Sequence, residues 1–143
     1  MTIPDYAAKA HPAQIELARI FTSVRLFGPP MSDPLIELVC HLFTPVEAEL
    51  AKNLPFYLPK SLEKIARRAR RNPEEIKDLL DTMARRKVIF GSEKGYCLLP
   101  IMPGMFEYLL MDGSDSEWHK RYGQLITALF STGYTRSYIS WSQ

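Results

Sequence analysis

A chain of 143 residues is long enough for one domain with a single hydrophobic core. Its composition, 46% apolar and 24% charged, is ordinary for a globular protein, and a net charge of +2 is too small to indicate nucleic acid or an acidic partner by itself. Two cysteines exclude a secreted disulfide scaffold, and the N-terminus lacks the pattern of a signal peptide. We therefore expect a cytoplasmic protein without a membrane-spanning segment, in which Cys40 and Cys97 are buried thiols.

Two helices are expected in the N-terminal part, residues 13–43. The first runs from Ala13 to about Phe27 and ends at Gly28-Pro29-Pro30, because proline cannot continue a helix. The second is capped by Ser32 or Asp33, with Pro34 in its first turn. Its near-helical apolar stripe consists of Leu35, Leu38, Val39, Leu42 and Phe43.

Three more helix starts follow in the middle of the chain. Thr44-Pro45-Val46-Glu47 is a capping box, and it predicts a helix that Pro55 ends. Ser61 begins a second, short helix. Asn72-Pro73-Glu74-Glu75 is another capping box, and it predicts a third helix from Pro73 to Arg86. The apolar stripe of that third helix is Ile76, Leu79, Leu80 and Met83.

The order of these elements predicts a winged helix-turn-helix over residues 44–100. Only a short link, Arg70 to Asn72, joins the second and third helices, so these two helices must cross steeply. Val88 to Phe90 and Tyr96 to Leu99 are strand-like, and the polar stretch between them predicts a hairpin with a loop of about four or five residues. The expected fold class is therefore mainly α (α+β), a winged helix-turn-helix with a small β-hairpin wing and additional flanking helices at both ends.

The C-terminal part, residues 101–143, is expected to hold two more helices and an aromatic tail. One helix begins near Pro103-Gly104 and ends at Asp112-Gly113, and the last runs from Asp115 to about Phe130. The tail, Ser131 to Gln143, carries three large aromatic side chains that a natural terminus rarely leaves unpacked. We expect the whole chain, 1–143, to form one domain with one core, or a homodimer.

No residue pattern predicts an enzyme or a metal site. The histidines His11, His41 and His119 have no partner at i+4, and Cys40 lies next to His41, so a helix directs these two side chains about 100° apart. There is no GxSxG sequence and no glycine-rich loop between a strand and a helix that could hold phosphate. We therefore expect a non-enzymatic protein that binds no cofactor within this chain.

The uneven distribution of positive charge is the main functional signal. Ten of the 18 basic residues lie within 28 positions, namely Lys60, Lys64, Arg67, Arg68, Arg70, Arg71, Lys77, Arg85, Arg86 and Lys87. As candidate nucleic-acid or partner contacts we select Arg67, Arg68, Arg71, Lys77, Arg85 and the wing residue Lys94. The alternative is a solvated basic face that offsets neighbouring acids. The third helix, which would enter the major groove of DNA, carries acidic side chains on its first turns that would repel phosphates: Glu74, Glu75, Asp78 and Asp81.

Two groups of short motifs carry a family resemblance. The first is Leu42 to Ala51 (LFTPVEAELA), then Leu54-Pro55-Phe56, then Ser61 to Ala66 (SLEKIA); the second is Gly95-Tyr96, Leu98-Leu99-Pro100 and Pro103 to Glu107 (PGMFE). In this order and spacing, over roughly Asp33 to Tyr134, the chain resembles the N-terminal winged-helix region of bacterial and archaeal ferredoxin-type proteins that carry 4Fe-4S clusters. The family's cluster ligands are CxxCxxCxxxCP runs beyond this region. This sequence has none, so the resemblance implies a 4Fe-4S cluster only in a region downstream of this chain.

Two functional hypotheses follow from these observations. The leading one is a non-enzymatic winged-helix module, the N-terminal protein-docking domain of an iron–sulfur electron-transfer protein, with another protein or a downstream domain of the same protein as its partner. The alternative is a DNA-binding winged-helix transcriptional regulator that uses Arg68, Arg71, Lys77 and Arg85 on phosphates. Generic helix-turn-helix regulators share the second helix and are the competing resemblance. Neither hypothesis involves a membrane.

Overall fold

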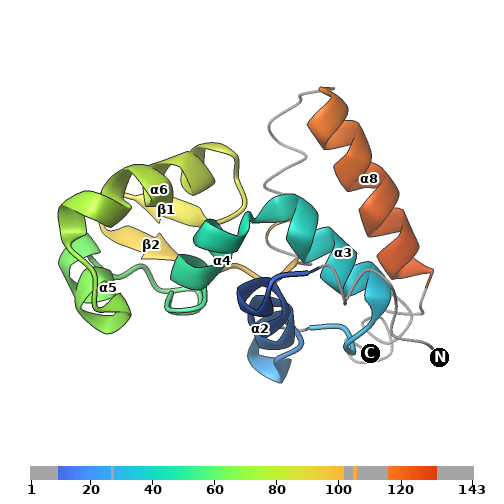
Figure 1. The fold of residues 1–143 in the computed structure, drawn as a ribbon, viewed down its shortest axis with the longest axis horizontal. Coiled ribbons are helices and arrows are strands. Elements are labelled where there is room, and N and C mark those ends of the chain that lie inside the picture. Colours follow the sequence, from blue (N-terminus) through green and yellow to red (C-terminus); the bar gives the residue numbers. More distant parts are fainter. Residues whose placement is uncertain (1–9, 27, 102–104, 106–115, 132–143) are drawn as a thin grey trace.

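The computed structural model describes residues 10–26, 28–101, 105 and 116–131 (Figure 1). These residues form helices and one two-stranded antiparallel sheet, so the expected mainly helical class is confirmed. In chain order the helices are α2 (Pro12–Phe21), the short 3₁₀ turn η1 (Val24–Leu26), α3 (Asp33–Leu42), α4 (Pro45–Ala51), α5 (Leu62–Ala69), α6 (Pro73–Arg85) and α8 (Glu117–Phe130). The strands are β1 (Phe90–Ser92) and β2 (Gly95–Cys97).

Helix α2 is shorter than expected. It ends at Phe21, and the hydroxyl of Thr22 donates to the carbonyl of Arg19 at 2.6 Å. The chain then turns back, because the Gly28 N–H donates to the carbonyl of Ser23 at 3.0 Å. At Gly28 a Cβ atom would lie 1.8 Å from the Phe21 carbonyl oxygen, so this close approach needs glycine. The prediction of one helix from Ala13 to about Phe27 was wrong for this reason.

The expected capping box at the start of α4 is confirmed. The Thr44 hydroxyl accepts from the Glu47 N–H at 3.2 Å, and the Glu47 carboxylate accepts from the Thr44 N–H at 2.9 Å. Ser32 caps α3, and Ser61 caps α5 by accepting from the Lys64 N–H at 3.3 Å. Helix α4 ends at Ala51, before Pro55, and a turn through residues 52–54 follows.

The link between α5 and α6 is as short as the sequence predicts. Arg70 ends α5 in the left-handed conformation, at φ 58°. Asn72 occupies the N-cap position of α6 and Pro73 begins the helix, but the Asn72 side chain makes no capping hydrogen bond. The predicted capping box at this position was therefore wrong. Glu75, its expected second member, instead pairs with Arg71.

The hairpin is tighter than expected. Its register pairs Phe90 with Cys97 and Ser92 with Gly95, which leaves a two-residue turn, Glu93-Lys94, instead of four or five residues. Val88 and Ile89, predicted as strand residues, precede β1 and are fully buried, because the core takes up both side chains. The segment 55–60 also pairs with β2 through backbone hydrogen bonds, which the sequence pattern did not show.

The buried apolar side chains form one continuous cluster that includes residues of every described helix. Helix α3 packs between α2 and α8, α2 also contacts α4, and α5 packs on α6. Figure 1 shows α8 beside α3, at the opposite end of the molecule from α5 and the hairpin. Five residues of the last helix were expected to point inward. Tyr122, Leu125, Ile126 and Leu129 are buried, whereas Trp118 is only half-buried.

Two expectations fall outside the described residues: the helix from about 103 to 113 and the aromatic tail beyond Ser131. Among the described helices, none combines the length and apolar character that crossing a membrane requires.

Candidate functional site

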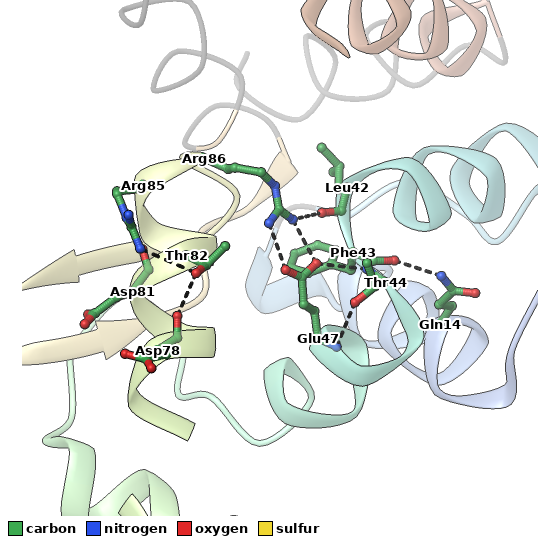
Figure 2. Close-up of polar contacts among 10 residues, drawn as sticks. All are labelled: Gln14, Leu42, Phe43, Thr44, Glu47, Asp78, Asp81, Thr82, Arg85 and Arg86. Atoms are coloured by element: carbon green, nitrogen blue, oxygen red, sulfur yellow. Dashed lines mark hydrogen bonds and ion pairs between the residues drawn. The ribbon is translucent and has the colours of Figure 1, made fainter. Parts of the chain in front are cut away.

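The candidate cations on or next to α6 are engaged by α6 itself. Lys77 Nζ lies 2.8 Å from an Asp81 carboxylate oxygen, and Arg71 Nε lies 3.4 Å from Glu75. Arg85 reaches the Asp81 carbonyl and the Thr82 hydroxyl, each at 3.5 Å (Figure 2). Three of the six predicted contacts therefore form hydrogen bonds within their own segment: Arg71, Lys77 and Arg85.

Asp81 connects α6 to the hairpin. Its carboxylate accepts from both Lys77 and the Tyr96 hydroxyl of β2, and these two hydrogen bonds lower the pKa of Asp81. Burial, together with the hydrogen bond to Asp81, raises the pKa of Tyr96 to about 12. Asp81 is thus held by contacts within the protein, with Lys77 of α6 and Tyr96 of β2.

Arg67 and Arg68 have a different environment. Both are exposed on α5, and neither forms an ion pair with any residue that the structure describes. With Lys60 and Lys64 they line a pocket of about 380 Å³. The other lining residues are Asn53, Pro55 and Ile65. The structure therefore brings four cations and no acid to one pocket.

Lys60 and Lys64 were part of the basic cluster in the sequence but were not selected as contacts. Lys64 shares α5 with Arg67 and Arg68, at i+3 and i+4, so the helical period could have placed it on their face. Lys60 precedes the helix and is brought to the pocket by its pairing with Tyr96, which no local period indicates. Lys94, the selected wing residue, is exposed in the hairpin turn and is not among the residues that line the pocket.

The wall of the pocket is held by backbone hydrogen bonds to β2 and to Leu98, which follows β2. Lys60 and Tyr96 exchange two such bonds, at 3.1 and 3.0 Å, and the Leu98 N–H donates to the Pro55 carbonyl at 2.8 Å. Gly95 permits this approach: it has φ +126°, and a Cβ there would lie 1.8 Å from the Lys60 carbonyl oxygen. Backbone hydrogen bonds thus hold both ends of segment 55–60, at Pro55 and at Lys60, without a ligand.

The same segment exposes apolar surface. Leu58 is 77% exposed and Tyr57 is 42% exposed. Tyr57 has φ 67°, which is uncommon for an aromatic residue, and its hydroxyl donates to the Arg25 carbonyl at 2.6 Å. A strained backbone that displays an apolar side chain is a frequent feature of binding sites.

One further arginine of the cluster is structural. Arg86 donates to both carboxylate oxygens of Glu47, at 2.8 and 2.9 Å, and to the Leu42 carbonyl at 2.6 Å (Figure 2). Burial alone would raise the pKa of Glu47, but hydrogen bonds from Arg86 and Thr44 outweigh it, so the pKa is lowered. This ion pair joins the start of α4 to the end of α6.

The thiols and histidines show no common centre. Cys97 is buried, as expected, and burial raises its pKa to about 11, whereas Cys40 is only half-buried. His41 stacks on Trp118, with ring centroids 4.8 Å apart. Within the described ranges, no three His, Cys, Asp or Glu side chains gather as metal ligands would. Comparison of the chain with protein-family models, with curated proteins and with solved structures found no match.

Proposed function

We propose that this chain is a non-enzymatic winged-helix module that docks a partner protein through the basic surface of α5. The succession of α4, α5, α6 and a hairpin supports the winged-helix part of the proposal, as does the pairing of segment 55–60 with β2. The observation that carries the docking part is the gathering of Lys60, Lys64, Arg67 and Arg68 around one pocket without acidic partners among the described residues.

The charges on α6 argue against the DNA-binding alternative. In a helix-turn-helix the second helix of the motif meets base edges with its N-terminal residues. Here that helix exposes Glu74, Glu75 and Asp78, and its cation Lys77 is held by Asp81. Carboxylates facing phosphates cost repulsion and release no counterions, so α6 is poorly suited to the major groove.

One observation still favours the alternative. The unpaired cations of α5, with Lys94 in the hairpin turn, could contact phosphates without help from α6. A DNA-binding regulator would then rely on the pocket face, because Arg71, Lys77 and Arg85 of the original hypothesis are engaged.

Gel retardation separates the two functions. At ~50 mM salt, where phosphate contacts are strongest, we expect no retardation of a random-sequence duplex by micromolar protein. Retardation that falls steeply with added salt, and that disappears in Arg67→Gln/Arg68→Gln but not in Lys77→Gln/Arg85→Gln, would establish DNA binding by α5 and refute the docking proposal.

The wider proposal places this module before an iron–sulfur domain, and it rests on the ordered motifs of the sequence. The chain itself does not fit a 4Fe-4S cluster, because its two cysteines cannot supply four thiolates and Cys97 is buried. Reading the gene past the codon for Gln143 tests this part. CxxCxxCxxxCP runs would support it, and an immediate stop codon would refute it.

A further inference from the structure

We propose that the pocket beside α5 binds an acidic peptide segment of the partner protein, with neighbouring carboxylates placed against Lys60, Lys64, Arg67 and Arg68. The inference rests on the proposed docking function and names the chemistry that the docking site recognises.

The first argument is the distribution of ion pairs. Some basic side chains elsewhere on the surface are matched locally: Lys52 lies 3.1 Å from Glu16 and 2.9 Å from Glu49, and Arg121 lies 3.3 Å from Glu37. The four cations around the pocket have no such match among the described residues. Like charges that line one pocket repel one another, and an anion bound in the pocket is attracted by all of them.

The size and lining of the pocket favour a peptide. A volume of about 380 Å³ suits a few side chains, and it lies within the usual range for small ligand sites. Pro55 and the almost fully buried Ile65 form the apolar part of the lining beside the cations. Leu58 and Tyr57 lie on the same segment and are exposed, which matches a ligand with both acidic and apolar side chains.

The acids of α6 oppose a long polyanion. A duplex large enough to contact α5 and the hairpin together would also approach α6, which packs against both and exposes Glu74, Glu75 and Asp78. A short acidic segment confined to the pocket avoids them. The backbone pairs Lys60–Tyr96 and Pro55–Leu98 keep the pocket segment in place, so little ordering is needed on binding.

The test is fluorescence anisotropy with a labelled hexaglutamate peptide at ~50 mM salt, with the matched hexaglutamine peptide as the uncharged probe. Lys64→Gln/Arg68→Gln removes two charges from the pocket. Arg19→Gln/Lys120→Gln removes the same charge from exposed positions on α2 and α8. We expect binding of hexaglutamate only, weakened about tenfold in the pocket variant and unchanged in the control variant. Far-UV circular dichroism checks that both variants fold.

Four outcomes would overturn the inference, and only the last of them also overturns the docking function. Equal binding to both double variants, or no binding of hexaglutamate at all, removes the pocket as the acidic-peptide site and leaves docking through another surface. If pyrophosphate displaces the peptide at concentrations well below those at which free glutamate does so, the pocket is a phosphate site. Tighter binding of duplex DNA, lost in the pocket variant, overturns the docking function itself.

Discussion

The ion pair between Glu47 and Arg86 yields the sharpest prediction. The Glu47 side chain is 5% exposed, whereas that of Arg86 is 31% exposed. Arg86→Met keeps much of the apolar stem but leaves a buried carboxylate without its cation. Glu47→Gln keeps an oxygen that can accept from the Thr44 N–H and leaves a guanidinium that water can reach. We therefore expect Arg86→Met to be the more destabilising change.

The magnitudes follow from this asymmetry. Removing one partner of a buried pair typically costs about 3–5 kcal/mol, and partial exposure of Arg86 places this case near 3 kcal/mol. Glu47→Gln loses charge-assisted hydrogen bonds without stranding a buried charge, which costs about 1–2 kcal/mol. For a chain of this length, Arg86→Met should lower Tm by roughly 10 °C.

Urea unfolding followed by circular dichroism measures both variants. Equal losses, or a larger loss for Glu47→Gln, would refute the reasoning from burial. The pH dependence is a second check. In the parent, the lowered pKa of Glu47 means that its stabilisation is present above the unfolded pKa and is lost as pH falls through the folded pKa. In Arg86→Met the lowering by Arg86 is lost, so the pKa of Glu47 in the folded state is higher than in the parent, and the deficit at about pH 7 should shrink as pH falls.

Two further predictions concern the hairpin and the α3–α8 contact. Gly95→Ala forces a left-handed residue against the Lys60 carbonyl; we expect a loss of about 2 kcal/mol or more in urea unfolding, and an unchanged midpoint would contradict the assigned close approach. Burial lowers the pKa of His41, more than its hydrogen bond with the Trp118 carbonyl raises it. The folded state therefore binds the proton less readily than the unfolded state, and stability falls as pH drops below about 6.5. His41→Phe keeps the stacking on Trp118, and thermal melts at about pH 7 and pH 5 should show a smaller loss than in the parent. An identical loss in both proteins would exclude His41 as the titrating group.

Local signals in the sequence predicted where helices begin. Thr44 with Glu47, Ser61, and Ser32 ahead of Pro34 all cap as expected, because capping depends only on residues within one turn. The boundaries of the hairpin could not be predicted in the same way. Val88 and Ile89 have strand propensity, but the core buries them ahead of β1, which is a tertiary effect.

The candidate site was only partly predictable for the same reason. The pairs Arg71–Glu75 and Lys77–Asp81 are four residues apart, so the spacing already contained them. The pair of Arg86 with Glu47 joins distant parts of the chain, as does the pairing of Lys60 with Tyr96. No periodicity within one segment indicates such contacts. The contact with Glu47 engages the Arg86 side chain, and the backbone pairing with Tyr96 fixes the position of Lys60 at the pocket.

The backbone bonds between segment 55–60 and β2 have a consequence for dynamics. Lys60 shares two hydrogen bonds with Tyr96, so the pocket wall opens whenever the hairpin opens locally. A ligand that binds only the closed pocket must then protect the amide hydrogens of Lys60, Tyr96 and Leu98 from exchange with solvent. Amides of α8, on the far side of α3, would gain no such protection from local opening (Figure 1). The exchange rates of the hairpin amides would thus report occupancy of the pocket, even for a ligand that never touches the hairpin.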